Sequence, residues 1–506
     1  MILILFLGTF PKHNQGEGFM KKIILITLMI FSIILLSCAK EEDNANNKTP
    51  DNNSAEIVAE SETTTDNAPD LPAIDMKGKT FKIFTAGWWD YSPLLITDII
   101  SERLTSEPIN DAVYNRQIYL EDKYNIKIEQ IDSPSDWGGS DKIITAVQAG
   151  DDIYDLALIR GMHFNSLVTS GSIIDLSEIS SIDLSRPWWD SNSYNSLSLR
   201  GKHYGVCSDI TINDDLAAWC VFFNKDMVKD YGLENPYNLV KGGKWTYDKV
   251  FEMGKLISKD VNGDGKMDKD DIFGIHHIQD AGSGIINCIG VNIGELDSEG
   301  NLIFTLDREE NITKMLSIFT RLFDLENVYN MHARGEGGSA TLFPQGQALF
   351  DFSAVQVALD LRMMEQDFGI LPYPKYNEAD TYMSSVSPLY LTVAVVPKTN
   401  RDIDNTGVIM EEMAYQGYKN IRPAFYGKLL QGKLARDDES LEMLAFLFDN
   451  IVYDVGSMWN LANFTLDFAG GIISAYNLNI ASFLEARKGL IEGDIQKIMA
   501  AINENN

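Results

Sequence analysis

The chain has 506 residues, a formal net charge of −31 and an apolar fraction of 45%. This length exceeds the usual size of a single domain, so two domains or lobes are expected. So negative a surface repels nucleic acids and anionic lipid headgroups, which argues against both as partners.

The N-terminal region has the pattern of an export signal. Lys21 and Lys22 precede the apolar run of residues 23–36, which is too short for a settled membrane span. The run ends in Leu-Leu-Ser-Cys at residues 35–38, which resembles the bacterial lipobox. That resemblance implies a lipid anchor with palmitate-type chains on Cys38 and cleavage before it. An ordinary secretory peptide with an incidental cysteine is the alternative.

The segments around this signal are expected to lie outside the folded body. Residues 15–18, Gln-Gly-Glu-Gly, back-translate to a purine-rich stretch that resembles a ribosome-binding site, so we expect Met20 to be the true start and residues 1–37 to be a misread leader plus signal peptide. Residues 38–77 are expected to hold the lipidated cysteine and a disordered tether, because their polar composition buries too little apolar surface to offset the entropy of ordering.

The other cysteines indicate no disulfide framework. Cys207, Cys220 and Cys288 form an odd number at wide spacing, which also fits no zinc site. We expect them to be buried free thiols.

The first half of the folded body predicts a mostly parallel α/β sheet. Strands are expected at 80–85, 126–129 and 154–159, separated by helices at 109–125 and 141–150. This β-α-β-α-β alternation is typical of a parallel sheet with crossover helices.

The second half predicts a further mixed region. A strand and then a helix are expected within 212–228, a helix at 246–258 and a strand at 271–278. Later elements are helices at 308–327 and 355–366, a strand at 391–397, and a mainly helical stretch over 405–500.

Residues 260–271, DVNGDGKMDKDD, have the spacing of a calcium-binding loop. Oxygen donors stand at every ligand position, and Gly265 lies where the loop needs a sharp turn. The expected ligands are Asp260, Asn262, Asp264, the carbonyl of Lys266, Asp268 and Asp271. Because a strand is expected to follow, a structural ion is favoured over a sensor. A solvated acidic turn is the alternative.

Several short motifs occur in the same order as in one family. They include TFKIFTAGWW at 80–89, YDLALIRGMHF at 154–164, PWWD at 187–190, VFFNKDMV at 221–228, GKWTYDKV at 243–250 and FGILPYPK at 368–375. With these motifs the chain resembles the carbohydrate-type extracellular solute-binding lipoproteins of ABC importers, of the maltose-binding kind, over most of residues 78–506.

The resemblance implies an α/β fold of the two-lobed type II periplasmic-binding kind, with hinge strands and a helical C-terminal part. Lobe 1 is expected to hold 78–212 and 373–398, and lobe 2 to hold 213–372 and 399–506. The implied function is capture of a sugar or oligosaccharide between the lobes and delivery to the ABC permease subunits, with no catalysis. A monomer outside the cytoplasm, held at the cell membrane by its lipid, is expected.

A sugar site combines aromatic platforms with carboxylate, amide or Arg groups. Polar and aromatic residues at the carboxyl ends of strands are therefore candidates, because open α/β sheets bind ligands there. The candidates are Trp88, Trp89, Tyr91, Arg160, Gln279 with its neighbour Asp280, Asp214 and Asp215 at the expected lobe crossing, and the late Trp459. Trp188 and Trp189 are interpreted as packing residues.

Two further classes of function stay open at this point. An extracellular glycoside hydrolase needs two carboxylates across a cleft, and a chain with 73 Asp and Glu residues always offers a pair. A binder of a non-sugar solute such as a peptide, or a surface adhesin, would use the same body.

Overall fold

The computed structural model describes residues 68–86, 99–133, 139–278, 280–330, 342–427 and 435–504. Residues Ala68–Asn506 form one compact unit. Among the helices of the described residues, none has both the length and the apolar character needed to cross a membrane.

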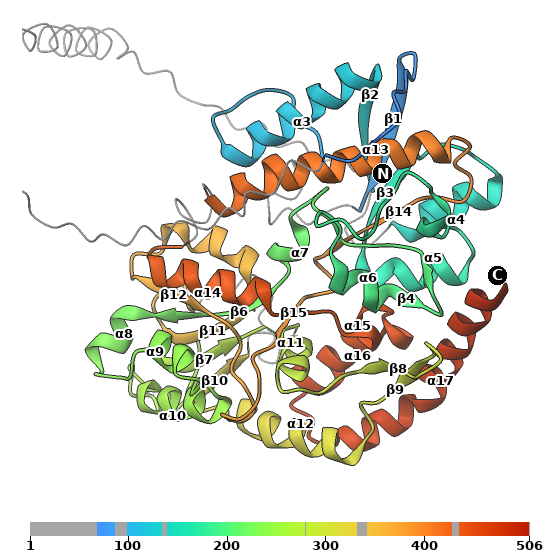
Figure 1. Cartoon of the computed structure of the whole chain (residues 1–506). Coiled ribbons are helices and arrows are strands. Elements are labelled where there is room, and N and C mark those ends of the chain that lie inside the picture. Colours follow the sequence, from blue (N-terminus) through green and yellow to red (C-terminus); the bar gives the residue numbers. More distant parts are fainter. Residues whose placement is uncertain are drawn as a thin grey trace, which may run out of the picture. The chain divides into compact units, whose positions relative to one another are not determined.

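The first sheet has the strand order β14-β3-β1-β2 (Figure 1). Its members are β1 (Lys79–Thr85), β2 (Ile126–Asp132), β3 (Leu156–Arg160) and β14 (Thr392–Val395). β1 pairs in parallel with β2 and β3, and β14 pairs antiparallel with β3. The predicted parallel sheet is confirmed, and the strand predicted at 391–397 forms its edge.

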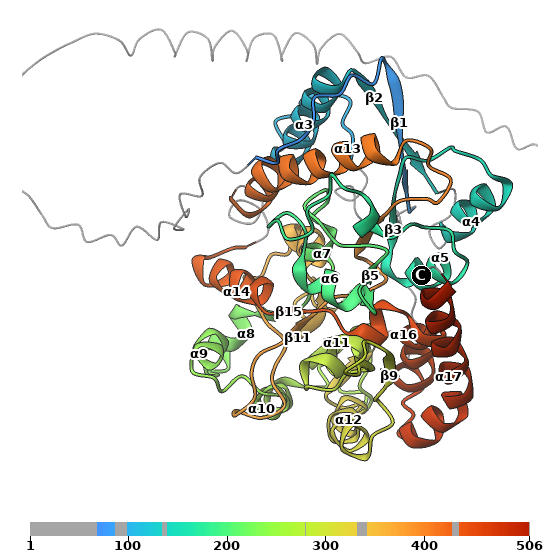
Figure 2. The same cartoon turned by 45° about the vertical axis from the view of Figure 1, so that its right-hand side comes forward.

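The helices around the first sheet begin and end at residues whose backbone preferences favour a helix start or a helix end. α3 (Pro108–Tyr124) has a proline in its first turn, where the missing N–H costs nothing. α4 (Ser140–Ala149) ends at Gly150, whose φ of 75° is left-handed. Figure 2 shows α3 beside α13 (Ile403–Gln416), and residues of the two helices contact each other. α5 (Phe164–Thr169) follows β3.

The second sheet has the order β10-β7-β11-β6-β12. Its strands are β6 (Trp219–Asn224), β7 (Phe273–His277), β10 (Val328–Asn330), β11 (Ala348–Ala354) and β12 (Phe368–Leu371). β7 is parallel to β10 and β11, whereas β6 is antiparallel to β11 and β12. Every residue of these five strands is buried, as expected for a sheet covered on both faces.

The helices around the second sheet follow the predicted order with shifted ends. They are α8 (Lys225–Asp230), α9 (Pro236–Lys241), α10 (Tyr247–Ile257), α11 (Ala281–Cys288) and α12 (Glu309–Leu322). The helix expected to reach residue 327 stops at Leu322, because a turn at 324–327 leads into β10. The helix expected at 355–366 is a 3-10 helix over Val355–Met363.

Two antiparallel chain segments, 206–218 and 386–394, run beside each other and connect the two sheets. Val206 bridges Ala394, and Ala218 bridges Val386, both in antiparallel sense. The outgoing segment between them contains the short helix α7 (Asn213–Leu216), which precedes the strand and the helix predicted within 212–228 and found as β6 and α8. These paired segments have the arrangement of a hinge between two α/β bodies.

Smaller elements and the C-terminal helices complete the unit. Two hairpins occur, β4 (Ser198–Leu199) with β5 (Lys202–His203) and β8 (Gly294–Leu296) with β9 (Leu302–Phe304). The remaining elements are α6 (Ser191–Leu197), β13 (Ser384–Ser385), α14 (Asp438–Asp449), β15 (Ile451–Val452), α15 (Val455–Met458), α16 (Phe464–Phe468) and α17 (Ile480–Glu504). Cys207, Cys220 and Cys288 are buried and free, as predicted.

Candidate functional site

Polar side chains gather where β3 and β7 end. Arg160 is the last residue of β3, is 1% exposed and pairs in register with Thr392 of β14. The side chain of Tyr390, two residues earlier in the chain than Thr392, donates to Asp280 Oδ2 at 3.4 Å. Asp280 directly precedes α11, at the end of β7. Tyr390 therefore connects the ends of two strands from different sheets.

Burial and charge control the ionisation of this group. Burial raises the pKa of Asp280 to about 6, and the hydrogen bond from Tyr390 partly offsets the rise. Burial also raises the pKa of Tyr390, as does the nearby Asp280, while the positive charge of Arg160 acts in the opposite direction. Asp280 and Arg160 therefore shift the pKa of the Tyr390 hydroxyl in opposite directions, Asp280 upward and Arg160 downward.

The outgoing hinge segment adds an amide to this array. Asn213 Nδ2 donates to Thr392 Oγ1 at 2.7 Å, and both side chains are buried. Because Thr392 lies beside Arg160 in the sheet, the amide continues the row of polar groups into α7.

Asp214 and Asp215 follow on α7 and are half-buried. Tyr426 donates its hydroxyl to Asp215 Oδ2 at 2.9 Å. Burial raises the pKa of Asp215 to about 6 against the lowering effects of Arg422 and Tyr426. Burial, and then the charge of Asp215, raise the pKa of Asp214 well above its ordinary value.

Arg422 supplies the positive charge on this side. Its Nη1 lies 3.7 Å from Asp209 Oδ2, and its guanidinium lies 5.8 Å and 5.5 Å from the ring centres of Tyr418 and Tyr426. Burial raises the pKa of Asp209 to about 8, although Arg422 lowers it. The result is a mixed set of carboxylates, phenols and one guanidinium, which is the chemistry that recognises hydroxyl groups.

Sequence reasoning identified part of this set. Arg160, Asp280, Asp214 and Asp215 were candidates, and the structure brings them to the junction of the two sheets. It missed Asp209, Arg422, Tyr426 and Tyr390. A signal existed for two of these, because Tyr418, Arg422 and Tyr426 recur every four residues and so share one helix face.

The other candidates divide into two groups. Trp88, Trp89, Tyr91 and Gln279 lie outside the described residues, as does Cys38. Trp459 is fully buried; its ring packs on Phe164 with centroids 4.9 Å apart, and its Nε1 donates to Ser196 O at 3.2 Å. This corrects its interpretation as a ligand platform, because its ring packs on Phe164 and its one polar atom is already bonded to Ser196 O.

Trp188 and Trp189 are packing residues, as interpreted. Both are 2% exposed. Their indole nitrogens donate to the two carboxylate oxygens of Glu411 at 3.0 Å and 2.9 Å. The side chains therefore tie the 187–190 segment to α13.

The 260–271 loop connects α10 to β7 and is closed at its base. Lys259 and Ile272 exchange both backbone hydrogen bonds across it. Asp260 accepts from the N–H groups of Gly263 and Gly265, at 2.6 Å and 2.9 Å. Met267 is half-buried against the core, as an inward anchor would be.

The oxygen donors of this loop are of the kind that a hard cation such as calcium prefers. In the structure, however, the loop carboxylates accept hydrogen bonds from backbone N–H groups of the same loop. Asp271 is fully buried and accepts from Val261 N and Asp268 N, each at 2.9 Å. Within the described part of the chain, no three acidic, histidine or cysteine side chains converge closely enough to hold a metal. An ion would therefore have to draw the side chains of Asp260, Asp264 and Asp268 inward.

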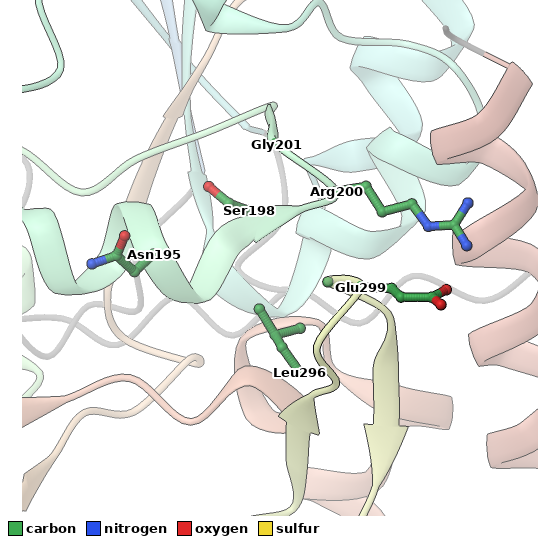
Figure 3. Close-up of a pocket in the computed structure, with 7 residues that line it drawn as sticks. Asn195, Ser198, Arg200, Gly201, Leu296 and Glu299 are labelled. Atoms are coloured by element: carbon green, nitrogen blue, oxygen red, sulfur yellow. The ribbon is translucent and has the colours of Figure 1, made fainter.

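An open pocket of about 680 Å³ lies apart from the predicted ligand residues (Figure 3). It is formed between the β4–β5 and β8–β9 hairpins, and none of the sequence candidates lines it. Figure 3 shows Arg200 and Glu299 extending in the same direction from facing turns. Arg200 Nε donates to Asn301 Oδ1 at 2.7 Å, which links the two hairpins.

Comparison with known proteins defines the class. The sequence profile described as "Bacterial extracellular solute-binding protein" matches residues 103–406, more than half of the chain. The chain therefore belongs to the bacterial extracellular solute-binding proteins. No curated protein sequence gives a significant match.

Solved structures share the fold at low sequence identity. An ABC substrate-binding protein of Listeria monocytogenes, in complex with cycloalternan, aligns with 12% identity and a TM-score of 0.53, covering 84% of this chain and 99% of the other. A sugar transporter of Rhizobium etli, in an open conformation, aligns with 14% identity and a TM-score of 0.53, covering 83% and 99%. UgpB of Mycobacterium tuberculosis, in complex with glycerophosphocholine, aligns with 14% identity and a TM-score of 0.51, covering 79% of this chain and 97% of the other. The fold is thus the two-lobed type II arrangement of ABC substrate-binding proteins.

Proposed function

We propose that this protein captures a sugar or oligosaccharide and delivers it to the permease of an ABC importer. The observation that carries the proposal is the row of polar groups at the junction of the two sheets. It runs from Asp280 and Arg160 through Asn213 to Asp215. A ligand that touches groups on both sides of a hinge stabilises the closed form.

The family and several structural neighbours support this function over catalysis. The matching family binds solutes, and neighbours from Listeria and Rhizobium are described with cycloalternan and as a sugar transporter. We infer that this protein is a binder and not a glycoside hydrolase. Release of a chromophore from nitrophenyl glycosides would contradict that inference.

The proposal is tested by a thermal-shift screen of the purified full-length protein. Mono- and oligosaccharides are compared with peptides and with glycerophosphodiesters, in a detergent without a sugar headgroup. A ligand that binds only the native state raises the melting temperature by mass action. A sugar hit supports the proposal, whereas a hit confined to peptides or phosphodiesters would assign a different solute.

We also propose how the protein is held and stabilised. A lipid on Cys38 anchors it outside the cytoplasm, on the basis of the lipobox-like sequence and the polar segment that follows it. Calcium in the 260–271 loop clamps the end of α10 to β7, on the basis of the donor types and the closed base of the loop. Mass spectrometry of the mature N-terminus and calorimetric titration with calcium test the two parts separately.

A further inference from the structure

A segment of the C-terminal region lies against one end of the row of polar groups. We call residues 459–473 the end wall. Asn460 Nδ2 donates to Met162 O at 3.1 Å, and Met162 is only two residues beyond Arg160, the last residue of β3. The end wall is therefore bonded to the chain directly beside the first-sheet end of the row.

The end wall also reaches the part of the row that belongs to the second sheet. Gly282 is two residues beyond Asp280, and a Cβ at this glycine would lie 2.6 Å from Ile473 Cγ1. Asn330, at the end of β10, donates from Nδ2 to Ile473 O at 3.3 Å. One continuous segment therefore packs beside the strand ends that carry both Arg160 and Asp280.

The end wall is enclosed and firmly held. The rings of Trp459 and Phe164 are both fully buried and pack on each other. Asp494 Oδ2, on α17, accepts from Ala462 N and from Asn165 Nδ2, each at 2.9 Å. Ala462 has a left-handed φ of 48°, a conformation that persists in a residue with a side chain only where its surroundings fix it. The end wall is thus a fixed boundary of the row.

The opposite end of the row is open to solvent. Arg160 and Asp280 are 1% and 9% exposed, whereas the side chain of Arg422 is 42% exposed. Tyr418 and Tyr426, whose rings lie beside that guanidinium, are half-buried. Partly exposed aromatic rings suit the apolar faces of sugar rings. A sugar chain held along the row can therefore continue into solvent at this end.

A row that is closed at one end and open at the other selects the ends of chains. An internal stretch of a glycan, or a ring without ends, has to continue in both directions. The end wall blocks one of these directions, and a clash with enclosed side chains rejects such ligands. A terminal sugar can instead place its hydroxyl groups against the buried polar groups.

We propose that this site binds the terminus of a linear oligosaccharide, with the terminal sugar at Arg160 and Asp280 and the rest of the chain leaving past Tyr426 and Arg422. The proposal rests on the proposed function, because it assumes that a sugar binds at the junction of the sheets. It adds the class of that sugar, which is a linear chain with a free end.

Isothermal titration of the full-length protein with matched oligosaccharides tests the proposal. The probes are linear oligomers of the maltose, cellobiose, mannobiose and xylobiose series, the same chains with an aminobenzamide label at the reducing end or a benzylidene cap at the non-reducing end, and cyclodextrins. A group on one end should change the affinity by less than about twofold, whereas a group on the other end, or closure into a ring, should weaken binding about tenfold or more. Long chains should bind one protein molecule each, whatever their length.

Three results of this titration would overturn the proposal or more. A ring that binds as tightly as its linear counterpart, or a chain blocked at both ends that binds as tightly as the free chain, would overturn the proposal and leave the proposed function intact. Several protein molecules on one long chain would do the same. Binding of no sugar at all would overturn both.

A variant at the open end tests the direction in which the chain leaves. Tyr418→Ala should weaken the binding of long oligomers more than that of the disaccharide, because only the longer chains reach this ring. Tyr231→Ala, which removes an exposed tyrosine at the end of α8, is the matched control and should leave the length dependence unchanged. An equal loss at every length in Tyr418→Ala would contradict the assigned exit.

Hydrogen exchange tests the end wall without depending on a sugar. The amide hydrogens of residues 459–465 should exchange slowly in the protein alone, and an added oligosaccharide should leave their rates unchanged, because the wall is fixed. Fast exchange in this segment would show a wall that opens and would overturn the proposal.

Discussion

Substitution of Trp459 tests whether this residue has a structural role or a ligand-binding role. The sequence suggests an aromatic platform, whereas the structure encloses the ring completely. Replacement by Phe keeps an aromatic side chain beside Phe164 and removes the indole nitrogen that donates to Ser196 O. We expect this variant to lose stability and to keep its affinity for ligand.

The expected loss follows from the contacts of the side chain. The hydrogen bond to Ser196 O contributes about 1 kcal/mol, and its removal leaves a carbonyl short of a donor. The ring atoms that Phe lacks contribute about 1 kcal/mol of buried apolar surface. Trp459→Phe should therefore lower the free energy of unfolding by about 2 kcal/mol, and Trp459→Ala by about 3–5 kcal/mol.

Urea unfolding and ligand titration measure the two effects separately. Trp245 offers a matched control in the second sheet: it is fully buried, its Nε1 donates to Pro372 O at 2.9 Å, and its ring centroid lies 5.3 Å from that of Phe350. Trp245→Phe should show a similar loss of stability. Both variants should bind ligand within about twofold of wild type once folded, since neither changes a ligand contact.

The reasoning would be refuted by the opposite division of effects. If Trp459→Phe left the free energy of unfolding unchanged but weakened ligand binding about tenfold, the ring would contact ligand, and the enclosed conformation would not be the one that binds.

Three further predictions concern the site and the loop. Arg160→Lys should weaken sugar binding about tenfold in titration, because a buried planar donor is replaced by a point charge; unchanged affinity would remove Arg160 from the site. Burial raises the pKa of Asp209 to about 8 from 3.8, so the native state holds the proton more tightly than the unfolded state. The stability that this proton contributes is fully present below the unfolded pKa of 3.8 and is lost as the pH rises towards 8. In urea unfolding, the free energy of unfolding of wild type should therefore fall relative to that of Asp209→Asn over this range. A difference between the two proteins that stays constant, or that changes in favour of wild type, would contradict the assignment. Removing calcium with a chelator should lower the melting temperature of wild type, and Asp260→Asn should abolish that response; equal melting with and without chelator would leave the loop a plain acidic turn.

Local patterns account for the parts of the fold that the sequence predicted. The first sheet was predictable because its strands alternate with helices of clear spacing and Gly150 marks a helix end. β11 was not predicted, because Asp351 interrupts its apolar run. In the structure Asp351 lies 2.6 Å from His276 Nδ1 on β7, and both side chains are fully buried. Such a pairing across strands cannot be recognised from either segment alone.

The same limit applies to the candidate site. Arg160 and Asp280 were accessible to prediction because Arg160 ends a strand and Asp280 follows one, and strand ends are where such sheets bind ligands. Asp209 and Arg422 are far apart in sequence and meet only through the tertiary fold. Trp459 shows the reverse error, since helical spacing in the late region does not reveal which face of the chain is enclosed.

The most direct test of the central claim is a titration of the best sugar from the screen against wild type, Asp215→Asn with Tyr426→Phe, and the control Asp404→Asn, which removes an exposed carboxylate on α13. Binding at the junction of the two sheets predicts that the double variant loses about tenfold or more in affinity while the control matches wild type. Equal affinity of all three proteins, with all three folded, would place the ligand elsewhere and contradict the account.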